Sequence, residues 1–203
     1  MRRLVPKSFY TRDVLEIAPD LIGMHLHRGG VVLRITEVEA YRWPGDTACH
    51  ARHGHTARNA PLWGPPGRAY VYLCYGIHHM LNLVTGVEGE AAAVLIRAAE
   101  PVKGLATVRR RRGGLEGPVL LTGPGKIGAA LGLDLSWNHH PLHTAKGLEI
   151  REGRPATDVV AGSRIGVDYA QPEHRDAPWR FADGDSRWVS HRRKLLGKAK
   201  RKK

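Results

Sequence analysis

The segment of residues 70–84 constrains the fold of this chain more than any other part of its sequence. Two runs rich in β-forming residues flank a Tyr-Gly pair, a pattern that predicts a strand, a tight turn and a second strand over residues 69–84. Tyrosines in strands are commonly half-buried packing residues. On a basic chain they also suit stacking against nucleic-acid bases or insertion between them. The side chains on or beside this turn are Tyr70, Tyr72, Tyr75 and Asn82.

The formal net charge of +13 on 203 residues points to a polyanionic partner. Residues 192–203 hold eight Lys or Arg and no acidic residue, which predicts a disordered basic tail after a domain of residues 1–191. Removing those eight charges from +13 leaves +5 on the domain. A second basic cluster, residues 109–112, ends an expected helix. Because the domain stays basic without its tail, nucleic acid is favoured over a small acidic ligand.

The sequence argues against a membrane-spanning or a secreted protein. No run approaches the ~18 apolar residues that span a bilayer. The basic start of the chain is followed by no apolar signal segment. Cys49 and Cys74 lie in dissimilar contexts and give no disulfide framework, which suits a reducing cytoplasm. A cytoplasmic protein is therefore expected.

The expected strands outnumber the helices and do not alternate with them regularly. This pattern favours a single α+β domain, with a curved, mostly antiparallel sheet, surrounding helices and a protruding β-hairpin. Thr11 is expected to cap a helix that carries Val14, Leu15 and Ala18. Residues 42–69 are rich in Gly, Pro, His and Arg and are expected to form a functional loop. The other expected elements are long strands at 31–41 and 91–98, helices within 101–112 and 123–131, the latter ended by Gly132, and short strands at 148–152, 163–167, 179–181 and 188–189.

A carboxylate stands next to an aromatic residue at the end of the strand of residues 31–41. Side chains alternate along a strand, so Leu33, Ile35, Glu37, Glu39 and Tyr41 are expected to share one face. Glu39 and Tyr41 would project side by side, about 7 Å apart, just before the long loop. Glu39 is therefore a candidate general base for a bound water, and a solvated surface glutamate is the ordinary alternative. Nothing nearby singles out Glu37 in the same way.

Two histidine-rich segments and one glycine-rich turn resemble ligand sites in composition. Residues 49–55 and 139–143 contain several histidines, but neither spacing matches a zinc motif, so no structural metal is expected. The turn from Gly123 to Lys126 lacks the spacing and the Ser or Thr of a nucleotide-binding loop. Its N–H groups could still hold one phosphate of a DNA backbone, whereas a plain helix start is the simpler interpretation.

Taken in order, a series of motifs from Phe9 to Ser190 resembles the alkyladenine (3-methyladenine) DNA glycosylase family. The block Tyr-Val-Tyr, Tyr-Gly and Asn placed after Glu-Ala-Tyr is specific. The matching motifs are Glu39-Ala40-Tyr41, His50, Thr56-Ala57-Arg58-Asn59, Pro66-Gly67, Tyr70-Val71-Tyr72, Tyr75-Gly76, Asn82, Leu95-Ile96-Arg97, Glu100-Pro101, Gly123-Pro124, Lys126, Arg164-Ile165-Gly166-Val167 and Trp188-Val189-Ser190.

The resemblance implies a monofunctional enzyme that flips an alkylated or deaminated purine out of duplex DNA and hydrolyses its N-glycosidic bond. Such an enzyme begins base excision repair and uses no metal or cofactor. The implied substrates are 3-methyladenine, 7-methylguanine and hypoxanthine in double-stranded DNA. A monomer at the nucleoid is the default for an enzyme that must scan DNA.

The resemblance also implies a role for each site residue. Glu39 would activate the attacking water, and Arg97 would orient Glu39 and that water. Tyr75 would enter the minor groove and fill the gap that the flipped base leaves. Tyr41, His50 and Tyr72 would sandwich the flipped base and Asn82 would disfavour the guanine amine, while Arg58 and Lys126 are expected to contact the DNA backbone.

Some residues depart from the family pattern. Leu62-Trp63 stands where Met-Phe is typical, and His78-His79 follows the turn where bulky apolar or aromatic residues are common. Lesion preference and the role of these histidines therefore stay open. Two other functions are carried forward. One is a catalytically weak damaged-DNA-binding protein of the same fold. The other is a histidine-based metal hydrolase, which would hold zinc and be inhibited by a chelator.

Overall fold

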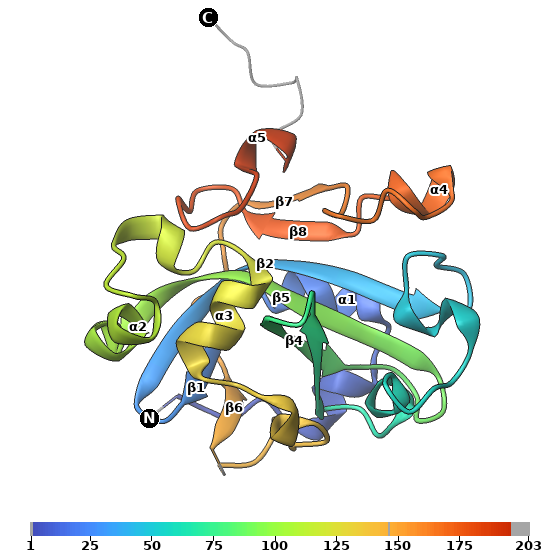
Figure 1. The fold of residues 1–203 in the computed structure, drawn as a ribbon, viewed down its shortest axis with the longest axis horizontal. Helices are drawn as coiled ribbons and strands as arrows, with labels where there is room; N and C mark the ends of the chain where they lie inside the picture. Colours follow the sequence, from blue (N-terminus) through green and yellow to red (C-terminus); the bar gives the residue numbers. More distant parts are fainter. Residues whose placement is uncertain (1, 146, 196–203) are drawn as a thin grey trace, which may run out of the picture.

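Two long antiparallel strands, β2 (Val31–Trp43) and β5 (Ala91–Lys103), form the centre of the sheet. The other strands are β1 (His25–Arg28), β3 (Ala69–Cys74), β4 (His78–Val84), β6 (Leu148–Arg151), β7 (Val159–Gly162) and β8 (Arg180–Asp183). The computed structural model describes residues 2–145 and 147–195, and within them the strand order is β3-β4-β5-β2-β1-β6. β8 pairs with β2 beyond the end of β1, and β7 pairs with β8 (Figure 1). The predicted α+β fold with an antiparallel sheet is confirmed.

The predicted hairpin is confirmed as β3 and β4, which pair from Ala69 opposite Leu83 to Cys74 opposite His78. Tyr75 (φ +50°) and Gly76 (φ +71°) occupy the turn, and the N–H of Ile77 donates to the carbonyl of Cys74 at 3.2 Å. Positive φ at both central residues is the type I′ turn that suits the twist of two-residue hairpins. Glycine adopts this backbone freely, whereas a tyrosine with positive φ is uncommon.

β2 changes the face of its side chains partway along its length. Leu33 and Ile35 belong to the main apolar core, but so do Val38 and Ala40. Two opposite register shifts against β5, one on each side of Glu37, mark the change. Ile35 pairs with Ala99 and Val38 with Ile96, so both strands change face over the same three-residue step. The prediction that Leu33 and Ile35 share a face with the two glutamates is therefore wrong. Glu37, Glu39 and Tyr41 lie opposite the core face.

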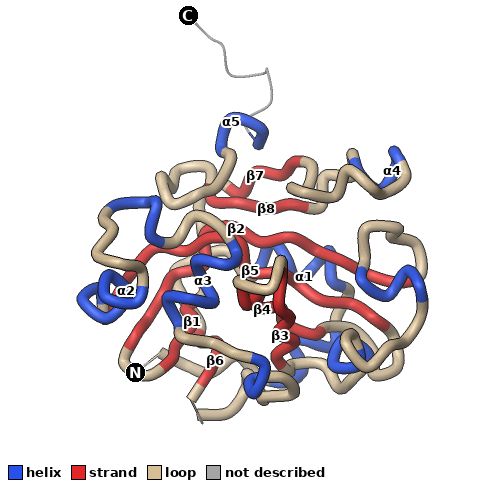
Figure 2. The backbone as a smooth tube through the Cα atoms, viewed as in Figure 1, coloured by secondary structure: helices blue, strands red, loops and turns tan. Residues whose placement is uncertain are grey.

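Helices pack against the sheet and close the apolar core (Figure 2). The core includes Val14 and Ile17 of α1 (Val14–Asp20) and Ile127 and Leu131 of α3 (Pro124–Leu131). Gly132, with φ +64°, ends α3 as predicted. The remaining helices are α2 (Leu105–Arg111), α4 (Pro172–Arg175) and α5 (Arg192–Leu195), and the 3₁₀ turns are η1 (Lys7–Thr11), η2 (His50–His53), η3 (Ala60–Trp63), η4 (Gly117–Leu120) and η5 (Leu135–Trp137).

The cap of α1 was predicted two residues too early. The carboxylate of Asp13 accepts the N–H of Leu15 at 2.8 Å and caps the helix. Thr11 ends η1 instead, and its hydroxyl donates to the carbonyl of Ser8 at 2.9 Å. An Asp directly before the first helical residue is an effective N-cap, so it takes precedence over the more distant threonine.

Several expected elements differ in the C-terminal third. Residues 163–167 and 188–189 are not strands, because their backbone groups bond to buried side chains instead of a ladder: Ile165 donates to Glu39, and Trp188 accepts from Thr36. The prediction of a disordered tail from residue 192 is wrong for its first four residues, which form α5. Residues 196–203 lie outside the described residues. In the described part of the chain, no helix has the length and apolar character needed to cross a membrane.

Candidate active site

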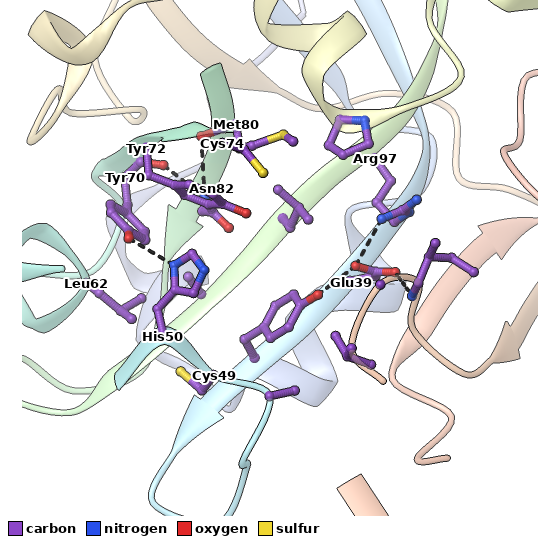
Figure 3. Close-up of a pocket in the computed structure, with 18 of the residues that line it drawn as sticks. Glu39, Cys49, His50, Leu62, Tyr70, Tyr72, Cys74, Met80, Asn82 and Arg97 are labelled. Atoms are coloured by element: carbon purple, nitrogen blue, oxygen red, sulfur yellow. Dashed lines mark hydrogen bonds and ion pairs between the residues drawn. The ribbon is translucent and has the colours of Figure 1, made fainter. Parts of the chain in front are cut away.

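A cavity of about 490 Å³ lies between β2, the β3–β4 hairpin, β5 and the loops before η2 and after β7. It brings together side chains that are far apart in sequence (Figure 3). Every predicted site residue except Lys126 lines it: Glu39, Tyr41, His50, Arg58, Tyr72, Tyr75, Asn82 and Arg97.

Glu39 is fully buried and still lines the cavity. Its Oε2 accepts the Tyr41 hydroxyl at 2.8 Å and Nη1 of Arg97 at 3.2 Å. Its Oε1 accepts the backbone N–H of Ile165 at 2.8 Å. Burial and then the Glu39 carboxylate raise the pKa of Tyr41 well above its ordinary value, so this phenol is a neutral donor. Three donors therefore fix the position of a carboxylate at the cavity wall.

Arg97, from β5, connects Glu39 to a second buried carboxylate, Glu37. Its Nε donates to Oε1 of Glu37 at 3.1 Å. Burial opposes the charge of Arg97, but the carboxylates of Glu39 and Glu37 outweigh it, and the pKa of Arg97 is raised. Strand alternation had not singled out Glu37, whose side chain is fully buried in an ion-pair network.

An aromatic wall from η2 and β3 faces the cavity. The ring of His50 meets that of Tyr72 edge to face, with centroids 4.5 Å apart. Its Nδ1 lies 3.1 Å from the hydroxyl of buried Tyr70. Burial, then the charges of Arg58 and Arg52, lower the pKa of His50 to about 4, so its ring is neutral near pH 7. The wall therefore offers two aromatic rings and no cation of its own.

Tyr41 forms a further part of the wall and is backed by a buried cation. The guanidinium carbon of Arg164 lies 4.6 Å from the centroid of Tyr41 and 4.9 Å from that of Trp179. Arg164 also binds Asp46 through two nitrogens, at 2.6 and 2.8 Å. This stack holds the Tyr41 ring in the orientation in which its hydroxyl reaches Glu39.

The hairpin supplies both a cavity residue and an exposed tip. Asn82, opposite Tyr70 in the pairing, donates through Nδ2 to the Tyr70 carbonyl at 3.1 Å, which fixes its amide at the cavity. Tyr75 is 90% exposed and Ile77 is 72% exposed, so two large apolar side chains project from the turn. Arg58 donates to the carbonyl of Leu73 at 3.0 Å and links the preceding loop to the hairpin.

His78 and His79 join the hairpin to α3. A Cβ at Gly125 would lie 2.8 Å from the His78 ring, and one at Gly128 would collide with the His79 carbonyl. The two glycines let α3 lie directly on β4, and the histidines take part in this packing. Lys126, at the start of the same helix, is partly buried, and burial and then Arg112 lower its pKa.

Among the described residues, no group of three or more His, Cys, Asp or Glu side chains is arranged to hold a metal ion. The histidine-rich segments found in the sequence form no such group there.

Sequence reasoning assigned no role to several residues that line the cavity. The loop of residues 165–167 belongs to the motif that begins at Arg164, but the sequence pattern predicts a strand there. Tyr169 is 57% exposed at the cavity, donates its hydroxyl to the carbonyl of Ala48 at 2.8 Å and lies under the Arg52 guanidinium. An aromatic residue after a matched motif was the one available signal for Tyr169.

Comparison with known proteins gives one consistent result. The sequence profile of the methylpurine-DNA glycosylase family matches residues 8–187. A protein of Nitrosococcus oceani, named as a candidate 3-methyladenine DNA glycosylase, is 68% identical over 195 residues, which cover 96% of this chain and 97% of the relative. The DNA-3-methyladenine glycosylase of Arabidopsis thaliana is 55% identical over 190 residues, 93% of this chain and 74% of the relative.

Proposed function

The chain belongs to the methylpurine-DNA glycosylase family, and from this premise we propose that it removes 3-methyladenine, and also 7-methylguanine and hypoxanthine, from duplex DNA. It is a DNA glycosylase of base excision repair that hydrolyses the N-glycosidic bond. The observation that carries the proposed site is a buried carboxylate, Glu39, fixed by three donors beside a cavity with aromatic walls.

In the proposed reaction a water molecule attacks C1′ of the damaged nucleotide. Its oxygen bonds to C1′, its proton passes to Glu39, and the electron pair of the C1′–N bond leaves with the base. The Glu39 carboxylate also stabilises the positive charge that develops on the sugar. Arg97 and Tyr41 hold the carboxylate in place, so little reorganisation is needed during the reaction.

The walls of the cavity suit an extrahelical purine. The rings of Tyr41, His50 and Tyr72 offer aromatic faces and edges for stacking. A cationic alkylated purine is attracted to a tyrosine face and is already a good leaving group. Neutral His50 adds no charge repulsion against such a base.

The exposed turn is proposed to occupy the space that the base leaves. Tyr75 lines the cavity mouth and projects into solvent, and apolar side chains inserted between base steps kink a duplex at the minor groove. The free energy of unfolding of Tyr75→Ala should lie within about 0.5 kcal/mol of that of the parent, since the side chain is exposed. It should weaken binding to a lesion duplex much more than binding to an undamaged one. Equal losses for both duplexes in a binding titration would argue against insertion.

Base release tests the proposed activity directly. Duplexes with one 3-methyladenine, 7-methylguanine or hypoxanthine are incubated with the full chain, and abasic sites are converted to strand breaks by hot alkali. Breaks are expected with the parent, with strong loss in Glu39→Gln. Glu88→Gln, the same change on an exposed carboxylate, is the matched control and should keep the parental rate. Lesion binding without release would point to the non-catalytic alternative, and a fully active Glu39→Gln would remove Glu39 as the base.

We also propose that the enzyme acts as a monomer on the DNA of the nucleoid. The proposal follows from the task of scanning DNA, for which a monomer is the default. Sedimentation should give a single species of about the mass of one chain, 22.4 kDa, and a dimer would contradict the proposal.

A further inference from the structure

We propose that Glu37 is a positioning residue for the reaction: together with Ser190 and Arg180 it holds Arg97 against Glu39 and balances the buried charge there. The inference rests on the proposed role of Glu39 and extends it to a second carboxylate. Glu37 is fully buried, which costs free energy unless every lone pair finds a partner. Its placement in the fold is therefore maintained by specific bonds rather than by solvent.

Four donors surround the Glu37 carboxylate. Its Oε2 accepts the backbone N–H of Ser190 at 2.6 Å. Its Oε1 accepts the Ser190 hydroxyl at 2.8 Å, Nε of Arg97 at 3.1 Å and Nη1 of Arg180 at 3.1 Å. The Arg180 side chain is itself fully buried, and its Nε donates to the carbonyl of Ser163 at 2.9 Å. Glu37 thus connects β2 to β5, to β8 and to the segment that follows β8.

Arg97 is fixed through three of its nitrogens. Nε binds Glu37, Nη1 binds Glu39 at 3.2 Å, and Nη2 lies 3.4 Å from the Ser190 hydroxyl. With one carboxylate alone the guanidinium could rotate about its single bond to Glu39. The second carboxylate and the serine remove that freedom, so the edge that meets Glu39 has one orientation.

The network is also balanced in charge. Two carboxylates, Glu37 and Glu39, face two guanidinium groups, Arg97 and Arg180, and all four residues are at most 5% exposed. Replacing the Glu37 carboxylate by an amide would leave Glu39 as the one carboxylate that faces both cations, so they would attract its negative charge more strongly in the variant than in the parent. The charged and titratable groups that face this pair are Tyr41 on β2, Tyr72 on β3, Arg97 on β5, Arg180 on β8 and Arg164 on the loop after β7.

The irregularity in β2 makes this arrangement possible. The register shifts on both sides of Glu37 mark the point where β2 changes face, so Glu37 and Glu39 both lie away from the core that contains Ile35. Ser190 is the last residue of the Trp188-Val189-Ser190 motif, to which the proposed base pocket assigns no role. Its two bonds to Glu37 give that motif a function in the site.

The test is single-turnover release of 7-methylguanine across a pH series by the full chain and by Glu37→Gln. This cationic base needs no protonation to leave, so the acidic side of the profile reports protonation of the general base. In Glu37→Gln we expect that acidic limb to move down by about one pH unit or more. We expect the maximal rate to fall by roughly 10- to 100-fold as Arg97 loses its orientation. An unmoved limb, with a rate loss that matches the unfolded fraction seen by circular dichroism, would overturn the proposal.

Two serine variants keep the proposal testable if Glu37→Gln does not fold. Ser190→Ala removes one donor to Glu37 and the contact with Arg97 but leaves all charges in place. It should lower the maximal rate severalfold without moving the limb. The matched control is Ser186→Ala, which removes a buried hydroxyl that accepts only the Trp188 N–H among the described residues, and it should keep the parental rate. Equal rates in the two variants would overturn the positioning role.

The outcomes separate this inference from the proposed function. A parent chain that releases no base at all contradicts the function. An active parent whose rate and pH limb are unaffected by loss of Glu37 contradicts only the role given to Glu37.

Discussion

The buried pair Asp46–Arg164, which backs the Tyr41 wall, allows a quantitative prediction for Asp46→Asn. The two side chains are fully buried and joined by two bonds of 2.6 and 2.8 Å. Removing one partner of such a pair leaves an uncompensated buried charge and costs about 3–5 kcal/mol. Arg164 would keep the carbonyls of Ala40 and His174, each at 2.9 Å, so we expect the lower end, ~3 kcal/mol.

The matched control is Asp20→Asn, the same chemical change at an exposed ion pair. Asp20 binds Arg12 at 2.6 Å, but the two side chains are 51% and 39% exposed. Exposed ion pairs contribute at most about 1 kcal/mol to stability, so the free energy of unfolding of this variant should be close to that of the parent. The contrast between the two variants isolates burial, because charge and shape change equally.

Urea unfolding followed by tryptophan fluorescence measures both variants, with slopes compared so that a change in midpoint can be interpreted as a change in stability. If the free energies of unfolding of Asp46→Asn and Asp20→Asn differ by less than about 1 kcal/mol, the buried Asp46–Arg164 pair contributes no more to stability than an exposed pair. In that case the pair does not hold the Tyr41 wall in place. A large loss in Asp46→Asn, with Tyr41 no longer held, should also lower the rate of base release.

Two further predictions concern protonation and DNA binding. The pKa of His50 is lowered to about 4 from an ordinary 6.5, so the unfolded chain binds this proton more readily. The contribution of His50 to the free energy of unfolding should be complete above pH 6.5 and fall by about 1.4 kcal/mol per pH unit as the pH drops toward 4. In urea unfolding, the free energy of unfolding of His50→Gln should fall less steeply with decreasing pH than that of the parent. Parallel pH curves for the two proteins would contradict the burial of a neutral His50 ring. Lys126→Ala should weaken binding to lesion and undamaged duplexes alike and reduce the slope of log affinity against log salt by about 1; an unchanged slope would mean that Lys126 meets no phosphate.

Local signals predicted the elements that depend on local chemistry. The Tyr-Gly break places a type I′ turn between β3 and β4, because the backbone there requires positive φ and the flanking residues favour strands. Gly132 ends α3 for the same kind of reason. Thr11 shows the limit of such rules, since Asp13, two residues later, competes for the same helix start and caps it.

The candidate site was predictable where a residue pointed into the cavity from a regular element. Glu39 and Tyr41 follow strand alternation from each other, and their side chains do meet, at 2.8 Å between Oε2 and the hydroxyl. Whether Glu39 was buried could not be predicted, because its third donor is the backbone of Ile165, which is 126 positions away in sequence. The same bond explains why the segment of residues 163–167 is not a strand.

Glu37 shows why the rest of the site escapes strand periodicity. The irregularity around Glu37 inverts the alternation, so the glutamate expected on the same face as Leu33 and Ile35 faces Arg97 instead. Its nearest partner, Ser190, is 153 positions away, and no local pattern reports a contact of that range. The burial of a charge is decided by the groups that meet it in three dimensions, and here those groups come from β5, β8 and the chain beyond β8. Strand alternation does not single out Glu37, yet its removal is expected to change how Glu39 acts in the reaction. The pH profile of base release by Glu37→Gln measures that change.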